Sequence, residues 1–251
     1  MFVELLGLPG AGKTAVCSLA LPMFRKRGLR SDRLQSLARE AMDRSRLGIN
    51  FLQSASERVG LYGCFSFASE NPELFDHLMR TVRHDQARLL WNMDMLAQLH
   101  FVRTHIDPDQ IVLVDEGLLH RGIASYIDQG VSDEFRDFLD CVTDEFVTII
   151  FDAPIKVCMD RAAARPKGMP LLFRDLSPLA REGMFHRFSE MIEVAAATRI
   201  ERGDTVLRID TTQPANLSAW EMARAVQIAA MTARKQAESP EIAARRLPAR
   251  S

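Results

Sequence analysis

The sequence has few of the features that mark secreted, membrane or zinc-binding proteins. Its 251 residues include four cysteines, no two of which form a C-x-x-C pair, and six histidines without metal-ligand spacing. No apolar run is long enough to suggest a membrane span. The 32 basic and 33 acidic residues nearly cancel, so net charge gives no reason to expect nucleic acid or an anionic membrane as a partner. We therefore expect reduced thiols and no cysteine or histidine metal site.

Glycine is also sparse, but three of the thirteen glycines fall in one short stretch near the start. The stretch GLPGAGKT, Gly7 to Thr14, fits the pattern G-x-x-x-x-G-K-[ST]. It follows the apolar run FVELL and precedes the apolar segment VCSLALPMF, which has helical character. A strand before the glycines and a helix after them form the context that a phosphate-binding loop requires.

The chemistry of this loop is anion binding. Glycines let backbone N–H groups close around a phosphate, and the following helix adds its positive N-terminal end. Lys13 would reach the β- and γ-phosphates of ATP, and the Thr14 hydroxyl would hold Mg²⁺. The nucleotide-binding residues expected here are Gly7, Pro9, Gly10, Ala11, Gly12, Lys13, Thr14 and Ala15.

The rest of the chain alternates between strand-like and helical segments, which predicts a three-layer α/β fold with a parallel sheet covered by helices on both faces. The expected strands are FVELL (2–6), IVLVD (111–115), FVTIIFD (146–152) and TVLRID (205–210), with RLQSL (33–37) as a weaker fifth. A helical insert spans residues 41–108. Within it, Asn71 and Pro72 begin a long helical stretch that we interpret as two helices. The polar tail 237–251 is expected to be frayed.

Two carboxylates stand where the strand 111–115 ends. In an open α/β sheet the ligand binds beyond the carboxyl ends of the strands, so Asp115 and Glu116 are candidates for the site. We assign Asp115 to Mg²⁺ or its bound water. Glu116 is assigned to accept a proton from the attacking oxygen or to orient that oxygen. Because adjacent residues on a strand point to opposite faces, which of the two is the base stays open.

A basic segment follows the next strand, in FDAPIKVCMDRAAARPKG. Arg161 and Arg165 are four residues apart and would share a helix face, and Lys167 and Arg174 follow. Guanidinium groups can bridge phosphate oxygens and neutralise charge in a transition state. We interpret residues 161–177 as a lid. A solvated helix face paired with Asp160 or Asp175 is the alternative.

With these features in order, the chain resembles the P-loop kinases of the nucleoside and nucleotide monophosphate kinase group, and thymidylate-kinase-like proteins most. The resemblance covers residues 1–37 and 111–234. It implies the sheet order 2-3-1-4-5, lid arginines that close on the phosphates, and adenine bordered by Thr211 to Pro214. The sequence departs from that family in two places. The family's third strand is followed by an acidic residue and an arginine, whereas Asp115 is followed by Glu116 and Gly117. No acceptor-phosphate arginine motif follows the second strand.

We therefore expect a single P-loop kinase domain over residues 1–236 that transfers the γ-phosphoryl group of ATP to a small acceptor. The acceptor stays open between a nucleoside, a nucleotide and a sugar-like compound, as do the choice of ATP or GTP and a homodimer. The alternatives are an ATP or GTP hydrolase and a nucleotide-binding regulatory module. The position of the loop leaves no room for a cleaved signal peptide before it, which predicts a cytoplasmic protein.

Overall fold

The computed structural model describes residues 1–44, 62–107, 109–143, 146–166 and 168–237. Its centre is a five-stranded, entirely parallel sheet with the order β2-β3-β1-β4-β5. This order confirms the predicted fold class. The strands are β1 (Phe2–Leu6), β2 (Ser31–Arg33), β3 (Ile111–Val114), β4 (Phe146–Asp152) and β5 (Val206–Asp210).

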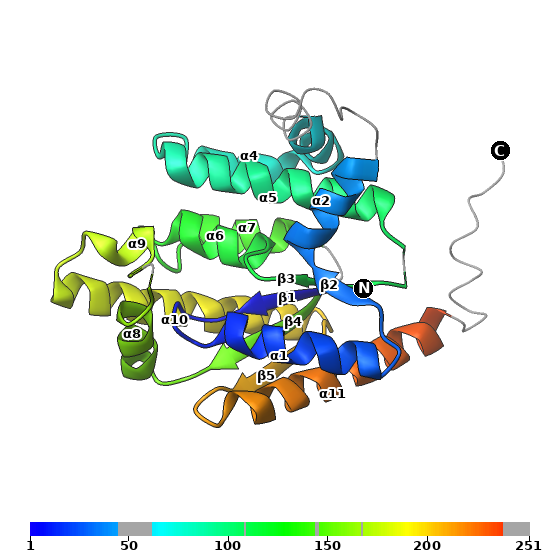
Figure 1. The fold of residues 1–251 in the computed structure, drawn as a ribbon. Helices are drawn as coiled ribbons and strands as arrows, with labels where there is room; N and C mark the ends of the chain where they lie inside the picture. The colour runs from blue at the N-terminus through cyan, green and yellow to red at the C-terminus, as the bar shows by residue number, and fades with distance from the viewer. Residues whose placement is uncertain (45–61, 108, 144–145, 167, 238–251) are drawn as a thin grey trace.

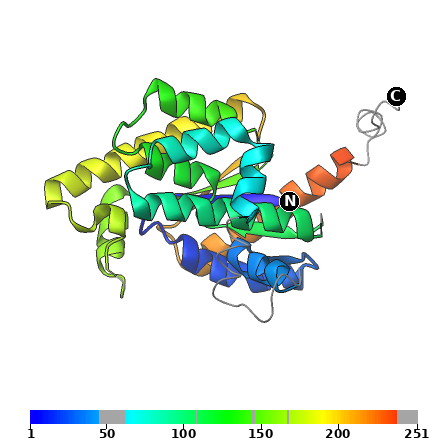
Figure 2. The same cartoon turned by 90° about the horizontal axis from the view of Figure 1, so that it is seen from above.

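Helices cover both faces of the sheet, as continuously apolar strands require. On one face α1 (Lys13–Lys26) and α11 (Ala215–Ala237) pack against each other, and on the other α6 (Leu118–Tyr126) packs against α10 (Pro178–Glu201) (Figures 1 and 2). The strands β1, β3 and β4 between these layers are almost wholly buried. Because all five strands are parallel, their carboxyl ends lie along one edge of the sheet.

The weak strand predicted over residues 33–37 is wrong in position. The strand β2 ends at Arg33, and the helix α2 (Leu34–Arg44) begins at the next residue. Leu34, Leu37 and Ala38 are buried. Their spacing of three and four residues lines one face of a helix, so burial of that face favours a helix over a strand. Arg33 consequently lies at the carboxyl end of β2.

The described part of the insert contains the two helices expected after Asn71. They are α4 (Pro72–Arg80), which begins with proline, and α5 (Gln86–His105), whose first turn is capped when the Asp85 side chain accepts from the Arg88 N–H. Residues 62–70 are also helical. The range 45–61 and the tail from residue 238 lie outside the described residues, so the prediction of a frayed tail stays a prediction.

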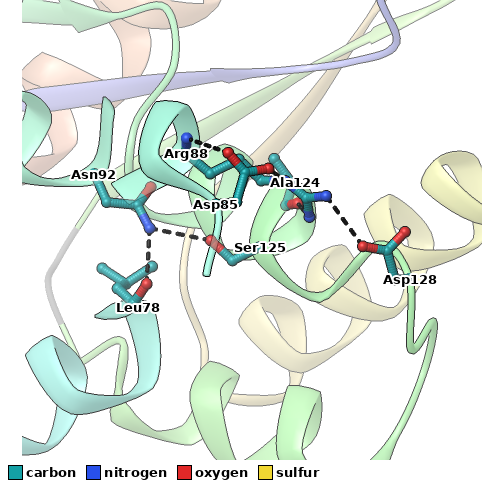
Figure 3. A network of polar contacts seen from close by, with 7 residues as sticks. All are labelled: Leu78, Asp85, Arg88, Asn92, Ala124, Ser125 and Asp128. Atoms are coloured by element: carbon teal, nitrogen blue, oxygen red, sulfur yellow. Dashed lines mark hydrogen bonds and ion pairs between the residues drawn. The ribbon is translucent and has the colours of Figure 1, made fainter. Parts of the chain in front are cut away.

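A polar network fixes α5 against α6 (Figure 3). Arg88 pairs with Asp85 at 2.7 Å and with Asp128 at 3.1 Å, and it donates to the Ala124 carbonyl oxygen at 3.2 Å. The buried Asn92 amide donates to the Leu78 carbonyl oxygen at 2.8 Å and to the Ser125 hydroxyl at 3.1 Å. Buried polar groups satisfied in this way specify one packing arrangement. The network therefore fixes the first half of α5 against α4 and α6.

The segments between β4 and β5 complete the edge. The helix α7 (Asp133–Cys141) precedes β4, while α8 (Ile155–Ala163) and the short α9 (Leu171–Arg174) follow it before the long α10. The predicted lid, 161–177, thus spans the end of α8, α9 and the connections beside them. Lys167 lies outside the described residues.

Candidate active site

The loop between β1 and α1 has the backbone conformation that its glycines permit. Gly10 and Gly12 have φ of 88° and 86°, which side-chain-bearing residues rarely adopt. A Cβ atom on Gly10 would also lie 2.0 Å from the carbonyl oxygen of Cys158 in α8. Glycine at position 10 is therefore required twice, by its φ angle and by the close approach of α8.

Lys13 folds back over this loop. Its ammonium group donates to the carbonyl oxygen of Gly7 and, at 3.3 Å, to that of Leu8. Desolvation lowers the pKa of Lys13 to about 8, against the opposing effect of the Glu116 carboxylate. A cation held by carbonyl oxygens in a partly buried site gains from a neighbouring anion, and a phosphate in the loop would supply one.

Asp115 directly follows β3 and is close to the start of α1. Arg33 connects the two, because one guanidinium nitrogen lies 3.6 Å from the Asp115 carboxylate and another donates to the Thr14 carbonyl oxygen at 3.2 Å. Burial raises the pKa of Asp115, although Arg33 and Lys13 act to lower it. The Oδ1 atom of Asp115 is buried and has no hydrogen-bond partner in the part of the chain that the structure describes.

These observations fit the predicted cation site. Mg²⁺ prefers oxygen ligands, and water molecules and the phosphate groups of the nucleotide usually supply most of them. One carboxylate and one hydroxyl from the protein are therefore sufficient. Asp115 offers a buried oxygen without a donor, and Thr14 offers its hydroxyl at the first turn of α1. The described residues contain no cluster of three or more His, Cys, Asp or Glu placed to hold a metal ion.

Glu116 points to a different partner from Asp115. Its carboxylate pairs with Arg121 at 2.7 Å, and about half of the Glu116 side chain is exposed. Arg121 itself is largely buried, and its guanidinium lies 5.4 Å from the ring centre of Trp91 in α5. Desolvation lowers the pKa of Arg121, while Glu116 and Asp94 act to raise it. The two carboxylates are thus separated, as expected for adjacent residues.

The two predicted lid arginines lie in different places. Arg165 lies beyond the end of α8, so the two do not share a helix, and its charge is near enough to lower the pKa of Lys13. Arg161, inside α8, donates to the Thr211 carbonyl oxygen at 3.1 Å. Thr211 is bound in turn to the Asp152 carbonyl oxygen at the end of β4. The charge of Arg165 therefore acts on Lys13, and Arg161 holds the loop after β5.

A pocket opens beside Asp115, between α5 and the carboxyl ends of β2 and β3. Its polar lining comes from Arg33, Gln35, Asp94, Gln98, Asp115, Glu116 and Arg121, and its apolar lining from Leu34, Met95, Leu113 and Val114. Gln98 donates to Asp94 at 2.7 Å across one turn of α5. Two other depressions include Asp107 and Gln110, before the start of β3, and so lie at the opposite edge from the phosphate loop.

Sequence reasoning missed several of these residues. Arg33 was missed because the second strand was placed too late in the chain. The contacts of Arg121 with Glu116 and Trp91 depend on the packing of α5 against α6, so no local signal in the sequence marks them. Asp94 and Gln98 carry no local signal beyond their four-residue spacing, which places both on one face of a helix.

Comparison with known proteins gives no match to a family model and none to a curated protein sequence. Solved structures do resemble the chain. Deoxyadenosine kinase from M. mycoides with bound dATP has a TM-score of 0.50 and 12% identity, covering 90% of this chain and 100% of that one. The same enzyme with the products dCMP and a flexible dCDP has a TM-score of 0.50 and 14% identity, covering 90% and 99%. A weaker likeness, TM-score 0.38 and 15% identity over 90% and 92%, is to shikimate kinase from Acinetobacter baumannii in complex with shikimate.

The protein has the fold of P-loop kinases: the sheet order, the loop after β1 and the deoxyadenosine kinase likeness agree on this. Its likeness to thymidylate kinases in particular has no support among these neighbours. None of the helices that the structure describes is long and apolar enough to cross a membrane.

Proposed function

We propose that the protein is a Mg²⁺- and ATP-dependent phosphotransferase that phosphorylates a small molecule bound in the pocket beside Asp115. The observation that carries the proposal is the arrangement of charged side chains around the loop after β1. Lys13 donates to the carbonyl oxygens of Gly7 and Leu8 within the loop. Arg33 connects Asp115 to the Thr14 carbonyl oxygen in the first turn of α1. Opposite charges gathered around a glycine-rich loop are what transfer of a phosphoryl group requires.

Each side chain has a task in this mechanism. The loop amides and Lys13 hold the β- and γ-phosphates, and Arg165 neutralises charge on the transferred group. Thr14 and Asp115 would hold Mg²⁺, which would supply positive charge to the phosphate groups when bound. Glu116, in the pocket beside Arg121, accepts the proton of the attacking acceptor oxygen. Arg161 orders the loop Thr211 to Pro214 beside the adenine.

The pocket favours a kinase over the hydrolase alternative. The pocket holds only about 30 Å³, so an acceptor would have to enlarge it. What supports acceptor binding is its lining, because donors and acceptors from three elements gather there, from Arg33 at the end of β2 to Asp94 and Gln98 on α5. Arg33, the last residue of β2, brings an arginine to this pocket, although the sequence has no acceptor-phosphate arginine motif after the second strand. A phosphorylated acceptor would bind Arg33 and Arg121, the two arginines that line the pocket. A neutral polyol or nucleoside would instead use Asp94, Gln98 and Glu116.

The experiment is a screen for acceptor-dependent ADP formation with Mg²⁺-ATP. Nucleosides, nucleoside monophosphates, sugars and sugar phosphates form the panel, and Lys13→Met is the inactive control. Acceleration of ADP formation by one acceptor class, lost in Lys13→Met, supports the proposal and chooses between a neutral and a phosphorylated acceptor. ADP formation that no acceptor accelerates would assign the protein to the hydrolases, and ATP binding without turnover would assign it to regulatory modules.

A further inference from the structure

A carboxylate lies inside the central strand, at a residue to which the proposed mechanism gives no role. Glu4 is the middle residue of β1 and is fully buried, although acidic side chains are rarely buried without a specific partner. Its neighbours in the sheet are Val114 of β3 and Thr148 of β4. Burying a charge at this position would be strongly unfavourable unless nearby groups stabilised it.

The Glu4 carboxylate caps a helix that begins more than a hundred residues later in the chain. Its Oε1 atom accepts a hydrogen bond from the backbone N–H of His120 at 3.0 Å, in the first turn of α6. The residue before α6, Gly117, has no side chain to cap the helix. N–H groups at a helix start need acceptors, and the positive end of the helix favours a negative charge.

Gly117 lies directly against this carboxylate. A Cβ atom on Gly117 would lie 2.7 Å from the Glu4 carboxyl carbon and 2.8 and 2.9 Å from its two oxygens. The φ of Gly117 is −85°, which any residue adopts. A side chain at position 117 would therefore displace the Glu4 carboxylate, although the backbone conformation there would accept it.

The contact joins the two halves of the proposed site. Glu4 is three residues before Gly7 on the strand that ends in the phosphate loop, and Gly117 directly follows Asp115 and Glu116. We propose that Glu4 is a positioning residue: its carboxylate holds the turn 115–117 so that Asp115 faces the Mg²⁺ position beside Thr14. This inference rests on the proposed function for the role of Asp115.

Glu4→Gln tests the role of the charge, since glutamine keeps the size of the side chain and an acceptor oxygen. Thr148→Val is the matched control, because it changes a buried polar residue beside Glu4 that is not in the turn. The first readout needs no activity: hydrogen–deuterium exchange of the amides of residues 115–123. The second is the Mg²⁺ concentration that half-saturates the ATP-induced rise in melting temperature.

Glu4→Gln should speed exchange in 115–123 and raise the half-saturating Mg²⁺ concentration by about tenfold, the usual effect of losing a residue that orients a metal ligand. ATP binding in EDTA should change by less than about twofold, and Thr148→Val should match the wild type. Gly117→Ala displaces the Glu4 carboxylate and should therefore shift both readouts in the same direction as Glu4→Gln. If Glu4→Gln does not fold, Gly117→Ala tests the inference in its place.

Unchanged exchange and Mg²⁺ dependence in Glu4→Gln, or equal changes in Thr148→Val, would overturn the inference. A wild type that binds Mg²⁺-ATP but transfers phosphate to no acceptor would refute the proposed phosphotransferase. The role of Glu4 would then still be tested by the Mg²⁺ dependence of the melting temperature, which needs no phosphate transfer. If the wild type binds no Mg²⁺-ATP, the proposed function fails, and the exchange measurement alone decides whether Glu4 holds the turn.

Discussion

The Arg33 guanidinium lies 3.6 Å from the Asp115 carboxylate, which brings the carboxyl end of β2 against that of β3. A second nitrogen of the same group donates to the Thr14 carbonyl oxygen at 3.2 Å and to the Ser18 hydroxyl at 2.9 Å. Arg33 thus connects the proposed metal-binding carboxylate to the first turns of α1. It also lines the pocket proposed for the acceptor.

Arg33→Ala should impair use of the acceptor more than binding of ATP. Loss of a charge-assisted contact costs on the order of 1.5–3 kcal/mol, so kcat/KM for the acceptor should fall at least about tenfold while the ATP dissociation constant changes little. Steady-state kinetics with each substrate varied would measure both. Arg30→Ala is the matched control, because Arg30 forms an exposed ion pair with Asp107 at the opposite edge. Equal losses in both variants would contradict the assignment.

Asp115→Asn should stabilise the free protein and weaken its response to Mg²⁺. Burial raises the pKa of Asp115, so the charged form is disfavoured in the folded state, and stability is lost as pH rises from the ordinary aspartate value through the folded pKa. Asparagine removes that penalty at neutral pH. Thermal unfolding at pH 7 should show a higher melting temperature without ligand and a smaller Mg²⁺-dependent increment with ATP. A lower melting temperature without ligand would show that the carboxylate is needed for folding instead.

Nucleotide binding should take up protons near pH 8. Desolvation lowers the pKa of Lys13 to about 8, so this lysine is roughly half neutral in the free protein at that pH. Phosphate in the loop favours the charged form, and binding should therefore consume roughly half a proton per ATP there. Titration calorimetry in two buffers of different ionisation enthalpy measures the uptake. Lys13→Met should lack this contribution, and equal uptake in both proteins would assign the proton to another group.

The two lid arginines should give different kinetic defects. Arg165 lies near Lys13, so Arg165→Ala should lower kcat on the order of 10³-fold, as loss of an arginine that acts on transition-state charge does. Arg161 contacts the Thr211 carbonyl oxygen, so Arg161→Ala should mainly raise KM for ATP. Each variant is the control for the other. Normal phosphoryl transfer by Arg165→Ala would show that residues 161–177 are a solvated surface and not a lid.

Much of the fold could be predicted because its signals are local. The run FVELL and the glycine spacing after it define β1 and the loop, and the runs that became β3 and β4 are buried and nearly continuous in apolar residues. The second strand was misplaced because β2 has only three residues, and none of Ser31, Asp32 and Arg33 is apolar. The helical spacing of Leu34, Leu37 and Ala38 was the available signal.

The candidate site could be predicted only where its residues follow a strand. Lys13, Thr14, Asp115 and Glu116 do so, and the roles given to them stay predictions. The acceptor side could not be predicted, because Asp94 and Gln98 reach the pocket through the packing of α5 on α6. Glu4 could be recognised in the sequence only as a single acidic residue inside an apolar strand. Its contact with Gly117 can be identified only in three dimensions.

The most direct test of the account is the destination of the γ-phosphate. The protein would be incubated with Mg²⁺ and γ-labelled ATP in the presence of a metabolite extract, and the labelled products would be separated and compared with those from Lys13→Met. The account predicts label in a small organic phosphate, formed by the wild type and not by the variant. Label found solely as inorganic phosphate, or remaining in ATP, would contradict it.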